Sequence, residues 1–246
     1  MRVLYLIPLL GAISALTAQQ PGAYTPPLTI AVINQSVSVA DSDVASWTAA
    51  IARQVHEDLA PVWKTDAQVV FQSTPPSGAW ICTLDDTGEA ANVSTVGVHF
   101  IQSDGKPGCV VHAGLIVSAG LGSVSQRLSH EILEMLVDPW LGNVSFAPAI
   151  GPNSATVYLR EVCDPVVNYT YTIDGVTVSD FTYPDFWLGG VLSQGAKLDQ
   201  LGLSTLSLQP TAHSYMLVRF ISSSGGINSL DSWSYIWGSY CMFGPC

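Results

Sequence analysis

One short run of charged residues has the spacing that metal chemistry requires. The run from Arg127 to Asp138 reads RLSHEILEMLVD and contains His130, Glu131 and Glu134 as a His-Glu-x-x-Glu string. On a helix, residues four apart lie on one face about 6 Å from each other, so His130 and Glu134 can reach one ion. Glu131 lies further round the same polar stripe and can address a metal-bound water. The run therefore predicts a helix that carries a metal site with Glu131 as the general base.

A polar stripe on a helix is usually a solvated face, and that interpretation has to be weighed first. Here the stripe lacks lysine, and most of the remaining helix positions are apolar. The chain also contains few glutamates: Glu57, Glu89, Glu131, Glu134 and Glu161. The last three fall on or shortly after this helix. This concentration around one histidine favours a cation site over a solvated face.

A third protein ligand must come from outside the motif. Asp138 follows His130 by about 12 Å along the helix axis, so we expect it to shape the turn after the helix or to support the ligands. The downstream string REVCDP supplies two more carboxylates, Glu161 and Asp164. We expect His130, Glu134 and one of these two to bind the ion.

The environment of Glu161 is left open by the sequence. In an extended strand it shares a face with Leu159 and other apolar residues, so its carboxylate points inward and needs a partner. That partner is either a metal ion or an arginine, Arg127 or Arg219, in a buried ion pair. Asp164 faces the other way unless the strand bends before the following proline.

The motif differs at one position from HExxH, the zinc-binding helix of zincin metallopeptidases. The layout of strand, helix, further strands and then motif helix also resembles the N-terminal subdomain of zincins. This resemblance implies Zn²⁺ and a peptide or protein substrate. A carboxylate in place of the second imidazole makes the site harder, which suits Mn²⁺ or Ca²⁺ better than HExxH would.

Three strings resemble an uncharacterised family of bacterial, phage and fungal proteins: SHEILEMLVDP from Ser129, REVCDPV from Arg160 and YTIDGVTVSDFTYPDFW from Tyr171. The resemblance spans roughly residues 96–190. It names no substrate, but it implies a shared site composed of His130, Glu131, Glu134, Glu161 and Asp164.

The pattern of apolar residues predicts an α+β, zincin-like fold with a mixed sheet and two main helices, the second carrying HExxE. We expect helices at 41–63 and 123–137, and strands at 28–33, 67–72, 80–84, 96–102, 109–117, 156–163, 169–178 and 214–221. One domain, 28–246, comprises the sheet with its motif helix (28–140) and a β- and loop-rich part (141–246).

Several features predict secretion. Residues 1–18 read as a signal peptide and 19–27 as an irregular, proline-rich leader. Four N-glycosylation sequons begin at Asn34, Asn92, Asn143 and Asn168. The five cysteines, Cys82, Cys109, Cys163, Cys241 and Cys246, suit an oxidising compartment and allow many pairings.

Composition excludes several classes of partner. The chain of 246 residues is 48% hydrophobic and carries a formal charge of −11, with eight scattered Lys and Arg residues. Disorder, nucleic-acid binding and, after removal of the signal, membrane association are therefore not expected. The sequence contains no GxSxG motif, so a serine hydrolase with a catalytic triad is not supported. A glycosidase is not supported either, because two carboxylates on one helical turn do not lie on opposite sides of a sugar.

Other candidates have simpler structural roles. We expect His112 to be a hydrogen-bonded structural histidine and Cys163 to be buried or disulfide-bonded. Aromatic residues near the C-terminus favour packing over a ligand platform. The sequence thus predicts a secreted metal-dependent hydrolase of metallopeptidase type; the alternative is a non-catalytic secreted glycoprotein, a binding or structural protein that retains the scaffold.

Overall fold

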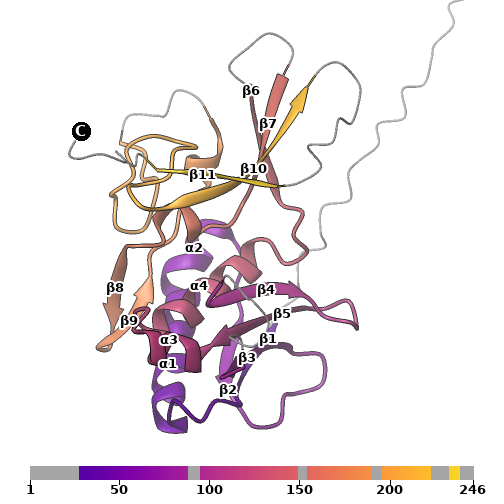
Figure 1. Cartoon of the computed structure of the whole chain (residues 1–246), viewed down its shortest axis with the longest axis vertical. Helices are drawn as coiled ribbons and strands as arrows, with labels where there is room; N and C mark the ends of the chain where they lie inside the picture. The colour runs from indigo at the N-terminus through magenta and orange to yellow at the C-terminus, as the bar shows by residue number, and fades with distance from the viewer. Residues whose placement is uncertain (1–27, 88–94, 149–153, 190–194, 223–232, 239–246) are drawn as a thin grey trace, which may run out of the picture.

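The computed structural model describes residues 28–87, 95–148, 154–189, 195–222 and 233–238 (Figure 1). The predicted signal peptide 1–18, the leader 19–27, Asn92, Cys241 and Cys246 lie outside the described residues. Within the described part, no helix has the length and apolar character needed to cross a membrane.

A five-stranded mixed sheet forms the first layer. Its strand order is β2-β1-β3-β5-β4, in which the first four strands are parallel and the edge strand β4 is antiparallel to β5. The strands are β1 (Thr29–Asn34), β2 (Gln68–Phe71), β3 (Trp80–Asp85), β4 (Gly97–Ile101) and β5 (Pro107–His112). Alternate residues of β3 are buried, as expected for a strand with one face on the core.

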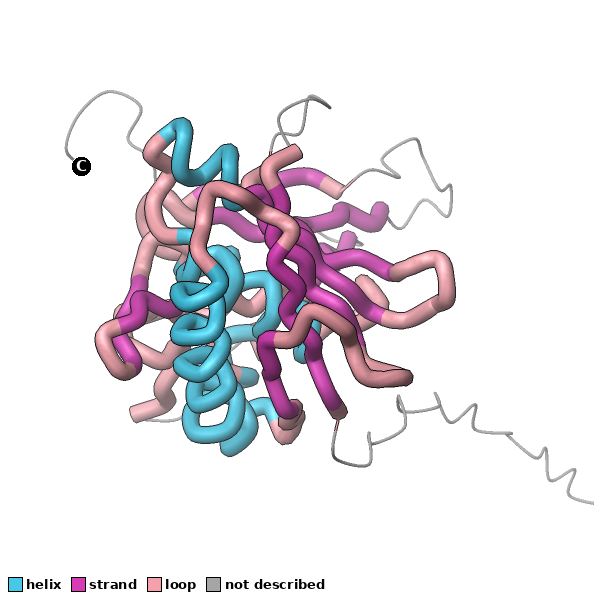
Figure 2. Tube along the Cα trace, turned by 90° about the horizontal axis from the view of Figure 1, so that it is seen from below, coloured by secondary structure: helices cyan, strands magenta, loops and turns pink. Residues whose placement is uncertain are grey.

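Helices form a second layer beside this sheet (Figure 2). Helix α1 (Asp41–Arg53) continues through a π-helical segment, η1 (Gln54–Leu59), into α2 (Ala60–Trp63). A short helix, α3 (Ala113–Ala119), precedes the motif helix α4 (Val124–Val137). Ser123 caps α4 by accepting a hydrogen bond from the backbone N–H of Gln126.

The second half of the chain builds two further sheets. An antiparallel sheet of order β11-β10-β7-β6 lies above the first sheet in Figure 1. Its strands are β6 (Val144–Pro148), β7 (Ser154–Leu159), β10 (Tyr215–Ser222) and β11 (Ser234–Trp237). The hairpin of β8 (Thr170–Ile173) and β9 (Val176–Ser179) contacts α4 through β9. Two 3₁₀ turns complete this half, η3 (Asp164–Val166) and η4 (Pro184–Trp187).

The mixed α+β class is confirmed, and three predicted strands need correction. The strand expected at 109–117 ends at His112, where the chain turns into α3. The strand expected at 156–163 ends at Leu159. The strand expected at 169–178 is instead the β8–β9 hairpin, because Asp174-Gly175 both adopt positive φ and form a tight turn. Strands β6 and β11 were not predicted.

Candidate metal centre

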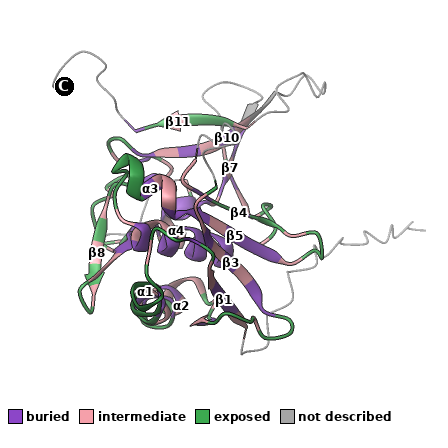
Figure 3. Ribbon diagram, turned by 60° about the horizontal axis from the view of Figure 1, so that its bottom comes forward, coloured by how far each residue is buried: buried purple, intermediate pink, exposed green. Residues whose placement is uncertain are grey.

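The motif helix α4 is the most enclosed helix of the fold. It lies between the β8–β9 hairpin and strands β4 and β5, and Figure 3 shows it buried at the centre while α1 exposes its outer face. The side chains of His130, Glu131 and Glu134 are only 2–3% exposed. The polar stripe therefore faces other parts of the protein, where its charges must be compensated.

His130 faces two carboxylates through one nitrogen. Its Nε2 lies 3.1 Å from Glu134 Oε2 and 3.3 Å from Asp164 Oδ1. Burial lowers the pKa of His130, but the charge of Glu134 and the hydrogen bonds with Asp164 and Glu134 raise it more, to about 10. In the metal-free protein His130 is therefore held as a cation between two acids.

The end of β7 explains how Asp164 reaches this position. Because the strand ends at Leu159, the chain bends, and η3 begins at Asp164. This bend turns the backbone N–H groups of Cys163 and Asp164 toward Glu134, whose Oε1 accepts both at 3.1 and 3.2 Å. Burial is the main cause of the raised pKa of Glu134. Glu134 is thus fixed from both sides, by the bend and by His130.

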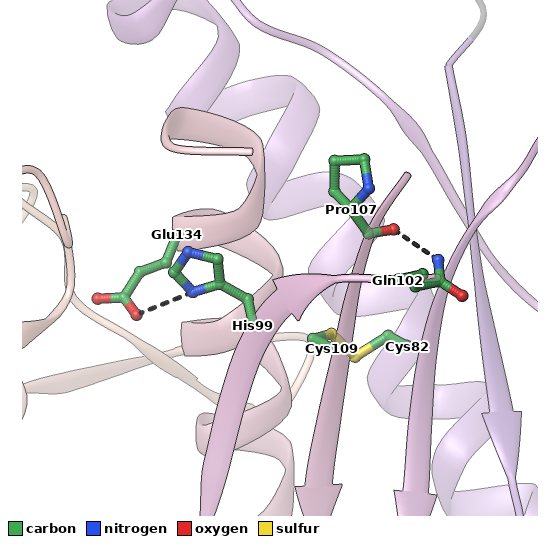
Figure 4. The surroundings of a disulfide bond; sticks show 6 residues. All are labelled: Cys82, His99, Gln102, Pro107, Cys109 and Glu134. Atoms are coloured by element: carbon green, nitrogen blue, oxygen red, sulfur yellow. Dashed lines mark hydrogen bonds and ion pairs between the residues drawn. A yellow bond between two sulfur atoms is a disulfide. The ribbon is translucent and has the colours of Figure 1, made fainter. Parts of the chain in front are cut away.

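Glu161 is also turned inward, although it is not part of a strand. Its Oε2 lies 3.6 Å from Nε2 of His99, which comes from the edge strand β4. Nδ1 of the same ring lies 3.9 Å from Glu134 Oε2, the contact drawn as a dashed line in Figure 4. Burial and the surrounding carboxylates raise the pKa of Glu161 well above its ordinary value, whereas burial lowers the pKa of His99 to about 4.

His99 was not among the residues predicted from the sequence. The signal that could have found it is the alternation of β4, in which Gly97 and His99 are buried and Val98 is exposed. An edge strand with a glycine and a histidine on its inner face leaves room for a polar cluster beneath it.

Glu131 lies against the inner face of β4 next to Gly97. A Cβ atom at Gly97 would come within 2.5 Å of Glu131 Oε1, so only glycine leaves this carboxylate its place. Burial raises the pKa of Glu131 to about 8, although the positive charge of His130 opposes the shift. A buried carboxyl group with such a pKa can exchange a proton near neutral pH.

Two further residues border the cluster formed by His99, His130, Glu131, Glu134, Glu161 and Asp164. Cys163 is a free, fully buried thiol whose Sγ lies 3.8 Å from the carbonyl oxygen of His130. Burial raises its pKa well above the ordinary value, which makes it a poor nucleophile. Tyr215 of β10 also belongs to the cluster, because burial and the charges of Asp164 and Glu134 raise the pKa of its hydroxyl.

Two residues singled out in the sequence have structural roles. Asp138 accepts the backbone N–H groups of Gly142 and Asn143 through Oδ1, both at 2.8 Å, and so shapes the turn after α4. His112 pairs with Asp85 through Nδ1 at 2.7 Å.

The predicted glycosylation sites differ in their availability. Asn168 is exposed, and its amide donates to the carbonyl of His213. Asn34 and Asn143 are half-buried, with both ends of each side-chain amide engaged in hydrogen bonds within the protein. Asn168 is therefore the best-placed acceptor among these three.

One disulfide fixes the sheet beneath the cluster. Cys82 and Cys109 are direct neighbours on β3 and β5, and His99 on β4 is the cross-strand partner of Cys109 (Figure 4). The disulfide therefore ties β5, the neighbour of the strand that carries His99, to β3.

Two groups of buried side chains could hold a metal ion: His130, Glu134 and Cys163 form one, and His99, Glu134 and Glu161 form the other. Asp164 belongs to neither group, but it contacts His130 Nε2 at 3.3 Å. No protein-family model, curated protein or solved structure matches the chain, so its chemistry has to be inferred from the geometry of these side chains.

Proposed function

We propose that the chain is a secreted metal-dependent hydrolase of metallopeptidase type. The observation that carries the proposal is the convergence on His130, whose Nε2 lies 3.1 and 3.3 Å from oxygens of Glu134 and Asp164. Two ligand atoms placed tetrahedrally at 2.0–2.1 Å from one zinc ion are about 3.3 Å apart. The distances from His130 to Glu134 and to Asp164 are therefore each close to the separation of two ligands on a single ion.

The donor set also fits a divalent cation chemically. One imidazole and two carboxylates suit Zn²⁺ and, being harder than a set with two imidazoles, also Mn²⁺ or Ca²⁺. His130, Glu134 and Asp164 would hold the ion, while Glu161 lies nearer to His99. The ion would act as a Lewis acid, polarising a substrate carbonyl and making water more acidic.

Glu131 would accept the proton from the attacking water and later deliver it to the leaving amine. Its burial beside Gly97 supports this acid–base role, because burial raises the pKa of a carboxyl group toward the working pH and an adjacent cation opposes that shift. Tyr215, on β10, interacts with Asp164 through its hydroxyl.

The arrangement of the first layer supports the zincin-like interpretation. A strand, a helix and further strands precede the motif helix, and the edge strand β4 lies alongside that helix. A substrate peptide would pair with the free edge of β4, which is the usual way in which an extended chain meets a sheet. The disulfide supports an oxidising compartment and hence secretion.

A non-catalytic glycoprotein is the competing proposal, and one observation favours it. His130, Glu134, Glu161 and Asp164 are each 2–5% exposed, and His130 already forms ion pairs with two acids. A scaffold role needs no further access to these groups.

Metal analysis and one isosteric variant separate the two proposals. The purified secreted chain would be assayed for bound metal by mass spectrometry and for hydrolysis of a general protein substrate. We expect at least one divalent ion per chain, and a loss of activity of about 10²-fold or more in Glu131→Gln. Glu57→Gln is the matched control, because Glu57 is half-exposed on η1 and pairs with Arg53. A folded chain without metal and without activity would support the scaffold role.

A further inference from the structure

The two groups of ligand side chains share one residue, Glu134. In each group, one atom from every residue lies within 4.8 Å of the others. Glu134 Oε2 is close to both imidazoles, 3.1 Å from His130 Nε2 and 3.9 Å from His99 Nδ1, while the other nitrogen of His99, Nε2, faces Glu161. A carboxylate in this position can bridge two cations, which in two-metal hydrolytic sites lie about 3.5–4 Å apart.

The second group contains atoms that lack partners. His99 Nε2 and Glu161 Oε2 are both buried, and neither has a hydrogen-bond partner among the described residues. Both side chains are 95% or more removed from solvent, and the two atoms face each other at 3.6 Å. Leaving buried polar atoms without a partner destabilises a fold, so a pair of them facing each other points to a ligand between them.

The separation of these atoms fits an ion between them. It is close to the distance of about 3.3 Å expected for neighbouring ligands of one zinc ion and too long for a good hydrogen bond. The His130 group does not use either atom, because the measured contacts of His130 are with Glu134 and Asp164. An ion bound by His130 would therefore leave His99 and Glu161 without a partner.

The charges of the cluster are also compatible with two ions. Four buried carboxylates converge here: Glu131, Glu134, Glu161 and Asp164. With all four ionised, their formal charge of −4 would equal in size the charge of two divalent cations.

We propose that His99 and Glu161 bind a second divalent cation, with Glu134 bridging it to the ion at His130. This inference rests on the proposed function, because it extends the same centre from one ion to two. One imidazole and two carboxylates suit a transition ion such as Zn²⁺ or Mn²⁺. The second ion makes β4 part of the centre and couples its position to ion binding.

The test is the number of ions per chain. The purified chain would be stripped with a chelator, reloaded with Mn²⁺, desalted and analysed for metal by mass spectrometry and for magnetic coupling by electron paramagnetic resonance. We expect two Mn²⁺ per chain with an exchange-coupled spectrum. His99→Gln and Glu161→Gln should each halve the metal content and abolish the coupling. His56→Gln should retain both ions, because His56 is exposed and pairs with Asp66.

Each outcome distinguishes the inference from the function on which it rests. One uncoupled ion in the parent chain, unchanged in both variants, would overturn the second site and leave the proposed hydrolase intact. One ion that either variant removes would also overturn it, because a single site would then use all the ligands. A folded parent chain that binds no ion would overturn both proposals. If both variants fail to fold, the metal content and spectrum of the parent chain decide.

Discussion

A buried pair of carboxyl groups outside the candidate metal centre leads to a quantitative prediction about stability. Asp180 is fully buried, and its Oδ1 accepts backbone N–H groups from Phe181 and Leu201 at 2.8 and 3.2 Å. Its Oδ2 has no donor among the described residues. Both oxygens of its neighbour, Asp199, already accept backbone N–H groups. Burial first, and then the charge and hydrogen bond of Asp199, raise the pKa of Asp180 to about 8.

The raised pKa sets the sign of the pH dependence. In the unfolded chain Asp180 loses its proton near 3.8, whereas in the folded chain it keeps it up to about 8. Its contribution to stability is therefore complete below pH 3.8 and is lost as the pH rises through this window. The slope is about 1.4 kcal/mol per pH unit, which amounts to roughly 4 kcal/mol between pH 3.8 and 7.

Asp180→Asn should remove this loss. The asparagine side chain keeps the Oδ1 acceptor. Its NH₂ group can donate to Asp199 at every pH, because an amide does not ionise as the carboxyl group of Asp180 does. We expect the variant to be more stable than the parent chain at pH 7 by about 2–4 kcal/mol, measured by urea denaturation between pH 4.5 and 7.5. The difference should shrink toward the acid end of this range.

Asp199→Asn is the matched control with the opposite sign. Its NH₂ group would face a backbone N–H donor, so we expect a loss of about 1–3 kcal/mol at every pH. Parallel pH curves for the parent chain and Asp180→Asn would refute the reasoning, because they would show that Asp180 is already ionised in the folded protein at pH 4.5.

Three further predictions concern the sheet and the motif helix. Replacing Cys82 and Cys109 together by serine opens a loop with a sequence separation of 27 residues. The free energy of unfolding, measured by urea denaturation, should fall by about 3.5 kcal/mol. An unchanged midpoint would contradict a role of the disulfide in stability. Gly97→Ala should displace Glu131 and lower hydrolysis about tenfold or more while the metal content stays constant, and full activity would show that Glu131 is not the base. Ser129→Ala removes two buried hydrogen bonds of α4 and should cost about 1–3 kcal/mol in thermal denaturation, whereas a neutral effect would show that water replaces them.

The sequence was informative wherever apolar periodicity and local signals agreed. Helix α4 was predicted within one residue, because its apolar residues follow helical spacing and Pro139 limits its extension. The apolar pattern of 169–178 predicts one strand, whereas Asp174-Gly175, a strong turn dipeptide, divides this segment into a hairpin. The end of β7 was harder to predict, because the burial of residues 161–166 comes from tertiary contacts with α4 that no local pattern encodes.

The same distinction applies to the candidate metal centre. The spacing within α4 was sufficient to select His130 and Glu134, because both lie on one helix turn. The choice between Glu161 and Asp164 depended on a bend, and the bend turns both carboxylates inward. His99 depended on the sheet order, since β4 reaches the motif helix only because it is added antiparallel at the edge beyond β5. Long-range strand order is not encoded in the local pattern of β4.

The burial of these acids is the strongest argument for a cation in the centre. A scaffold gains nothing from several carboxylates that lie close together away from solvent, since like charges in a buried site raise one another's pKa and cost stability. Amides at the same positions would keep much of the packing without this cost, as we expect for Asp180→Asn. A divalent ion reverses the balance, because it stabilises the ionised carboxylates and gives His99 Nε2 and Glu161 Oε2 a common partner. Glu161→Gln should therefore stabilise the metal-free chain at neutral pH and weaken metal binding, whereas a purely structural Glu161 would lose stability in both conditions.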